Sequence, residues 1–69
     1  MPLSFTNVGE TRYIKKIGGK AEVKQFLEKL GFVVGGMVKV VSITEGNLIV
    51  QVKESRIAIS REMANKIMV

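Results

Sequence analysis

The sequence contains no cysteine, no histidine and no tryptophan. It has one proline, and its four aromatic residues are three phenylalanines and one tyrosine. Without cysteine, the chain can form no disulfide bond and offers no thiolate as a metal ligand or nucleophile. Without histidine, it cannot form a serine–histidine–aspartate triad. These absences exclude the commonest catalytic and zinc-binding arrangements, so we expect a protein that is not an enzyme.

A long hydrophobic run is also missing. No stretch approaches the ~18 apolar residues of a membrane span. The first residues, MPLS, lack the positive charge that opens a secretory signal. We therefore expect a cytoplasmic protein that does not insert into a membrane.

The chain has 69 residues, 46% of them hydrophobic, which suffices for one core. A chain this short buries only about 60% of its unfolded surface, so we expect a single domain over residues 1–69 without a deep cleft. The net charge is +5, and it is spread evenly: residues 1–35 hold six Lys/Arg and three Glu, and residues 36–69 hold five and three. An even spread is weaker evidence for nucleic-acid binding than a basic arm.

The segment from Lys20 to Ile43 predicts an amphipathic helix, a glycine elbow and a strand. The apolar face of the helix follows the i, i+3, i+4, i+7 spacing, with Val23, Phe26, Leu27 and Leu30 expected to point inward. Gly31 comes directly after this face and predicts a left-handed helix end, after which Phe32 closes back on Leu27.

Five segments rich in β-branched residues predict short strands: Thr11–Ile17, Met37–Ile43, Leu48–Lys53, Arg56–Ile59 and Ile67–Val69. Alternation fails at Val40-Val41, which predicts a bulge. Glu45-Gly46-Asn47 is typical of a hairpin turn. We expect the last segment to pair with Thr11–Ile17 as an edge strand.

Ser60 is suited to cap a second short helix over Arg61–Lys66, with Met63, Ala64 and Ile67 inward. Together these elements predict a mainly β fold, a small barrel of about five short antiparallel strands with two short helices.

Three groups of glycine and aliphatic residues follow one another along the chain. They are Leu3-Ser4 with Gly9-Glu10, Ile14 and Ile17-Gly18-Gly19; Leu30-Gly31-Phe32 with Gly35 and Val38; and the tail Ile57–Val69, IAISREMANKIMV. In this order and spacing the whole chain resembles the FeoA family, small cytoplasmic proteins of ferrous iron transport. The family often has proline before the turn glycines, whereas this chain has Val8 and Val34, which predicts looser turns.

The resemblance implies an SH3-like barrel that acts as an accessory to FeoB, a membrane protein with a cytoplasmic GTPase domain that moves ferrous iron. The same domain type resembles the C-terminal module of iron- and manganese-dependent repressors. Three hypotheses therefore stay open: an interaction module of a FeoB-type transporter, a small basic barrel that binds nucleic acid, and a stand-alone relative of the repressor module. We favour the first, with the protein as a monomer or weak homo-oligomer.

The carboxylates give no sign of a metal site. The six acidic residues stand singly, with no two at i, i+3 or i+4: Glu10, Glu22, Glu28, Glu45, Glu54 and Glu62. Hard cations need several oxygen ligands at once. We expect no metal ligand set and no bound cofactor, while the resemblance leaves room for a weak Fe²⁺ contact shared with a partner.

Two further patterns suggest chemistry but have simpler explanations. Gly18-Gly19-Lys20 lies between a strand and a helix, as in a phosphate loop, but Ile14 stands where the first glycine is needed and Ala21 replaces the Ser/Thr. We interpret the segment as a turn. Among the aromatic residues, Phe5, Phe26 and Phe32 are expected in the core, which leaves Tyr13 as the one surface candidate for base stacking.

The candidate partner-binding surface is the bend after the first helix. Three consecutive large apolar residues are hard to bury together, so we expect at least one to face outward, rimmed by lysines. The predicted contact residues are Phe32, Val33, Val34, Lys29 and Lys39.

Overall fold

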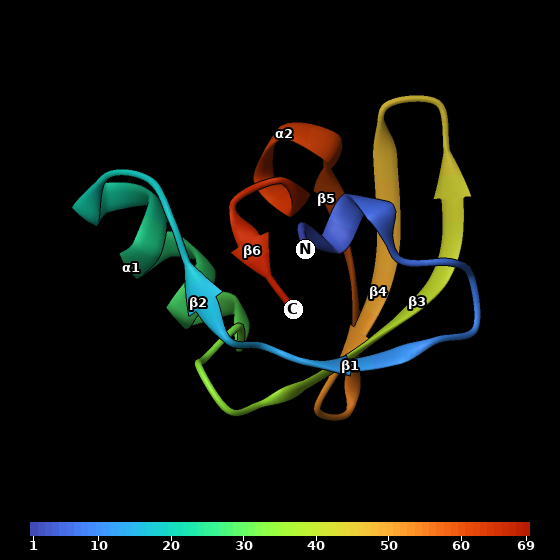
Figure 1. The fold of residues 1–69 in the computed structure, drawn as a ribbon, viewed down its shortest axis with the longest axis horizontal. Coiled ribbons are helices and arrows are strands. Elements are labelled where there is room, and N and C mark those ends of the chain that lie inside the picture. The colour runs from blue at the N-terminus through green and yellow to red at the C-terminus, as the bar shows by residue number, and fades with distance from the viewer.

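A computed structural model describes all 69 residues, which form two antiparallel sheets, two α-helices and one 3-10 turn, η1 (Leu3–Phe5) (Figure 1). The larger sheet has the strand order β1-β3-β4-β5. Its strands are β1 (Thr11–Tyr13), β3 (Met37–Thr44), β4 (Asn47–Val52) and β5 (Ser55–Ser60). The smaller sheet pairs β2 (Lys16–Ile17) with β6 (Ile67–Met68). The chain is thus mainly β, as predicted.

The β3–β4–β5 meander follows the sequence pattern closely. The hairpin turn at Gly46 has a positive φ of 83°, which glycine adopts without steric cost. The register shifts between Val40 and Ser42, so the predicted bulge is confirmed. In β4 the alternating residues Leu48, Val50 and Val52 are buried.

The predicted strand Thr11–Ile17 is wrong as a single element. It is split into β1, which pairs with β3, and β2, which pairs with β6. At the break, the Ile14 amide donates to the Gly36 carbonyl at 2.9 Å, and the Lys15 amide donates to the Met68 carbonyl at 2.7 Å. The chain changes partner here because Ile14 turns into the core, so the fold has six strands instead of five.

The predicted pairing of the last segment with Thr11–Ile17 is confirmed, but its predicted position at an edge is wrong, because the first residues of the chain lie along its other side. Ile17 lies opposite Ile67, and Pro2 forms a further bridge with Met68. Figure 1 shows both chain ends beside β6. On the same side, the Ser4 hydroxyl donates to the side-chain oxygen of Asn65, which ties η1 to the residue after the second helix.

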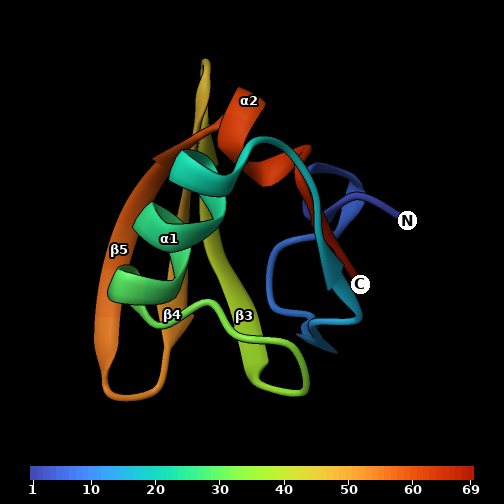
Figure 2. The same cartoon turned by 90° about the vertical axis from the view of Figure 1, so that its left-hand side faces the viewer.

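Helix α1 (Ala21–Leu30) ends as predicted. Gly31 is left-handed, its amide donates to the Glu28 carbonyl at 3.0 Å, and the Phe32 amide donates to the Leu27 carbonyl at 2.9 Å. These two bonds define a Schellman ending. Phe32 and Leu27 are both fully buried. The helix lies on one side of the molecule, in front of the larger sheet in the view of Figure 2.

Helix α2 (Arg61–Ala64) is shorter than predicted, because the chain turns at Asn65 and Lys66 to enter β6. Its cap is as predicted: the Ser60 hydroxyl oxygen accepts a hydrogen bond of 3.2 Å from the Met63 amide. No helix in the structure has the length and apolar character needed to cross a membrane.

One core of fourteen buried apolar residues lies between the sheets and the helices: Leu3, Ile14, Ile17, Leu27, Phe32, Val38, Val40, Leu48, Val50, Val52, Ile59, Ala64, Ile67 and Val69. The expectation that Phe5 and Phe26 are also core residues is wrong, because both are exposed. Leu3 fills the core from η1 and leaves Phe5 outside. On α1, Leu27 enters the core while Phe26 lies on the flank of the apolar face.

Candidate partner-binding surface

The bend after α1 separates its three apolar residues. Phe32 is fully buried, whereas Val33 is 38% and Val34 66% exposed. The prediction that at least one faces outward is confirmed, but Phe32 belongs to the core and is not available to a partner. The left-handed Gly31 turns Phe32 back onto the helix and sends the next two residues outward.

A tight turn holds the two valines in place. The Gly36 amide donates to the Val33 carbonyl at 2.9 Å, and Gly35 has a φ of +88°. This arrangement puts Val34 at the second position of a four-residue turn with glycine at the third, as in a type II turn. The Gly35 amide also donates to the Ile14 carbonyl at 2.7 Å, so the turn is fixed to the segment between β1 and β2.

The exposed valines line a hollow of about 400 Å³ between this turn, α1 and β2. Its wall has an apolar part and a charged rim: Ile17, Val33, Val34, Lys15, Lys16, Lys24 and Glu28. We call these residues the Val33–Val34 surface.

The rim differs from the predicted one. Lys24 and Glu28 are one helical turn apart and face the hollow, whereas Lys29 does not line it, because one further residue rotates the side chain by about 100° around the helix. Lys39 lies on β3 opposite Thr11 and Gln51, on the outer face of the larger sheet. The rim of the hollow is formed by Lys15 and Lys16 instead of Lys29 and Lys39. The change of strand partner at Ile14 brings Lys15 and Lys16 to this position.

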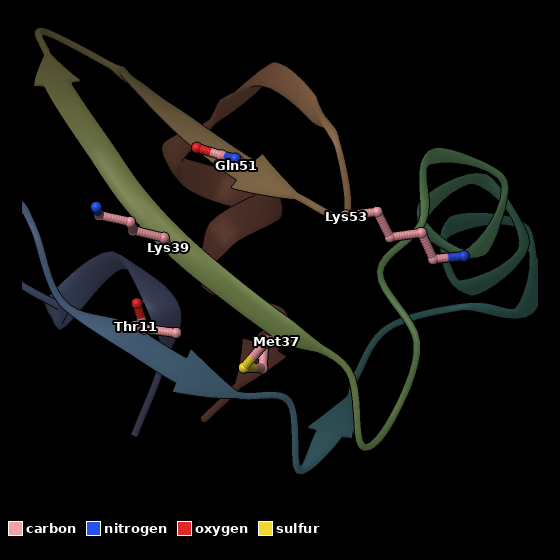
Figure 3. Close-up of a pocket in the computed structure, with 5 residues that line it drawn as sticks. All are labelled: Thr11, Met37, Lys39, Gln51 and Lys53. Atoms are coloured by element: carbon pink, nitrogen blue, oxygen red, sulfur yellow. The ribbon is translucent and has the colours of Figure 1, made fainter.

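The outer face of the larger sheet carries a second hollow that sequence reasoning missed. It measures about 360 Å³ and is lined by Thr11, Met37, Lys39, Gln51 and Lys53. Figure 3 shows Thr11, Lys39 and Gln51 on three adjacent strands, while Lys53 extends away from the sheet. The alternation of polar residues within each strand is visible in the sequence, but their alignment depends on the strand register.

Other sequence candidates are placed apart from these hollows. Gly18-Gly19 forms a turn before α1, and the Gly18 amide donates to the Lys66 carbonyl at 2.7 Å. No three of the carboxylates come together as potential metal ligands, and Glu10 is engaged with Arg12 in an ion pair of 2.6 Å.

Comparison with known proteins matches this chain to one family. The FeoA domain model matches residues 1–69. A candidate Fe(2+) transport protein A of Methanocaldococcus jannaschii is 40% identical over 68 residues, which cover 99% of this chain and 83% of the relative.

Two solved structures share the fold. The zinc complex of FeoA from Stenotrophomonas maltophilia, described as an SH3 domain protein and a candidate activating factor of ferrous iron transport, superposes with a TM-score of 0.85 at 24% identity over 99% of this chain and 87% of that one. A manganese-dependent transcriptional repressor gives a TM-score of 0.89 at 16% identity over 97% of this chain and 39% of that one. The predicted SH3-like fold is therefore confirmed.

Proposed function

Because the chain belongs to the FeoA family, we propose that it is a non-enzymatic accessory protein of ferrous iron transport that binds the cytoplasmic region of a FeoB-type membrane GTPase. The family match over the whole chain supports the link to iron transport. The absence of histidine and cysteine supports a role in binding instead of catalysis. The proposed place of action is the cytoplasm, where that region of the transporter lies.

The observation that carries the proposed contact is the exposure of Val33 and Val34 inside a rim of lysines. Apolar side chains in water cost free energy that a partner recovers by covering them, at about 25 cal/mol per Å². A hollow with an apolar centre and a polar rim has the usual anatomy of a protein interface.

The size of the chain limits the contact. Its whole accessible surface is 4457 Å². A transient interface at or below about 1,200 Å² in total fits a chain of this size. We therefore expect reversible binding, consistent with a regulatory subunit.

The test uses Val33→Asp and Val34→Asp in the full chain, with binding to the purified cytoplasmic domain of the FeoB-type transporter measured by calorimetry. Each variant should retain the circular dichroism spectrum of the parent, because both side chains are exposed, and should weaken binding by about tenfold or more. Val8→Asp is the matched control: Val8 is 56% exposed and also precedes a turn glycine with positive φ.

Folded Val33 and Val34 variants that bind as tightly as the parent would eliminate this surface as the contact. Equal losses in all three variants would show that added negative charge, and not the place of the valines, weakens binding. In cells that depend on this protein for Fe²⁺ uptake, Val34→Asp should lower the uptake rate and Val8→Asp should not.

The likeness to the manganese-dependent repressor supports a second candidate function, a stand-alone relative of that protein's matching module. At 16% identity the likeness concerns the fold alone. Neighbouring genes discriminate between the two: a large membrane GTPase beside this gene favours the transport role, and a DNA-binding regulator favours the other.

A further inference from the structure

The outer face of the larger sheet carries a row of side chains that crosses all four strands. Thr11 lies opposite Lys39, Lys39 opposite Gln51, and Gln51 opposite Arg56. Residues directly opposite each other in antiparallel strands point to the same face. All four are exposed, so they form one continuous polar strip on the surface.

The charge of this face is positive and uncompensated. Lys39, Arg56 and Lys53 make no ion pair, since the one salt bridge in the structure joins Arg12 to Glu10. The remaining carboxylates lie on the two helices and at the hairpin turns: Glu22, Glu28, Glu45, Glu54 and Glu62. Along the strands themselves, no acidic side chain neutralises the two cations of the row.

An apolar pair adjoins the row. Tyr13 lies opposite Met37, and they are 63% and 55% exposed. Met37 and Lys39 both line the hollow of about 360 Å³. Tyr, Met and Arg are enriched in protein interfaces relative to the rest of the surface, and this face presents one of each.

We propose that this outer face is a binding site for an acidic peptide segment that carries an apolar side chain beside its carboxylates. The carboxylates pair with Lys39 and Arg56, and the apolar side chain covers Met37 and Tyr13. Gln51 supplies a neutral hydrogen-bonding group between the two charges, and Thr11 supplies another at the end of the row, beyond Lys39. The site shares no residue with the Val33–Val34 surface and does not depend on the proposed function.

A peptide fits this face better than a nucleic acid. Binding of single strands without sequence preference relies on several aromatic side chains that stack successive bases. Here Tyr13 is the one aromatic residue on the face, and the cations are few. The salt-dependent affinity for phosphate backbones grows with the number of neutralised phosphates, which this face keeps small.

The test measures fluorescence anisotropy of a short labelled peptide of Glu, Ser and Gly around a central Leu, with the full chain. A peptide with Gln in place of Glu is the control ligand. The double variant Lys39→Gln/Arg56→Gln removes the proposed pair. The matched control, Lys20→Gln/Arg61→Gln, removes the same charge from exposed positions at the starts of the two helices.

The Glu peptide should bind at least about tenfold more tightly than the Gln peptide, and the Lys39/Arg56 variant should lose about tenfold while the control loses less than about twofold. Met37→Ser should also weaken binding. In the parent protein, amide chemical shifts of Lys39, Gln51 and Met37 should move on titration, which locates the site without relying on a variant.

Three results would overturn the proposal. One is the absence of measurable binding by the parent. Another is an equal loss in both double variants, which would show attraction to the net charge alone. The third is tighter binding of a labelled single-stranded oligonucleotide through the same residues, which would identify the face as a nucleic-acid site.

Discussion

Met1 and Val69 exchange two backbone hydrogen bonds: the Val69 amide donates to the Met1 carbonyl at 2.8 Å, and the Met1 amine donates to the Val69 carbonyl at 3.3 Å. With the Pro2–Met68 bridge and the β2–β6 pairing, they extend the smaller sheet to a third segment. The last residues of the chain thus have partners on both sides, and they close the barrel over the core.

Deletion of Ile67–Val69 should therefore destabilise the fold strongly. Ile67 is fully buried and Val69 nearly so, and burial of each such side chain contributes about 1.5–3 kcal/mol. The deletion also leaves β2 without a partner. Thermal unfolding measures the loss, and a truncated chain that melted within a degree or two of the parent would show that β6 does not close the barrel.

Replacement of Gly31 by valine should lower stability by more than the replacement of Gly46. Both glycines have positive φ, which a β-branched residue resists. A Cβ at Gly31 would also lie 3.0 Å from Cγ1 of Val52, whereas Gly46 has open space around it. Thermal melts compare the two variants. Equal losses would show that the contact with Val52 adds nothing to the cost of the Gly31 replacement. Unchanged stability of Gly31→Val would contradict the Schellman ending.

Val8→Pro should stabilise the protein by about 0.4–1 kcal/mol, because proline restricts the unfolded chain. Val8 occupies the second position of a turn in which the Glu10 amide donates to the Asn7 carbonyl at 3.1 Å and Gly9 has a φ of +90°. Proline favours this position, and the Val8 amide makes no backbone hydrogen bond. Chemical denaturation tests the effect, and a loss of stability would show that the turn rejects the proline ring.

Calorimetry with Mn²⁺, a stable substitute for Fe²⁺, should show no binding by the isolated chain tighter than about 10⁻⁴ M, the range of weak oxygen-ligand sites. The reason is the dispersal of the carboxylates, no three of which converge. Repeating the titration with the FeoB-type cytoplasmic domain present tests for a shared site. Stoichiometric micromolar binding by the chain alone would contradict the prediction and implicate a glutamate.

Local signals in the sequence predicted the elements that depend on neighbours in the chain. Gly31 after an apolar helix face, Gly46 between two β-rich segments and Ser60 before α2 each specify a turn or a cap within a few residues. The strand alternation of Leu48, Val50 and Val52 likewise determined which side of β4 is buried. These features require no knowledge of distant partners.

Apart from the pairing of the last segment with residues 16–17, features that depend on distant partners were not predicted. The split of Thr11–Ile17 follows from the transfer of the chain from β3 to β6 at Ile14, which the sequence of that segment does not reveal. The same transfer brings Lys15 and Lys16, in place of Lys29 and Lys39, to the rim around Val33 and Val34. Aligning Lys39 with Gln51 and Arg56 likewise requires the register of three strands.

The β2–β6 pairing has a consequence for how the chain folds. Ile17 and Ile67 are 50 positions apart, so their pairing closes a loop over most of the chain, and the entropic cost of closure grows with the length of the loop. The β3–β4–β5 meander joins residues only a few positions apart. We therefore expect folding to begin in the meander and to end with the docking of β6. The last three residues should form their contacts late in the folding of the barrel.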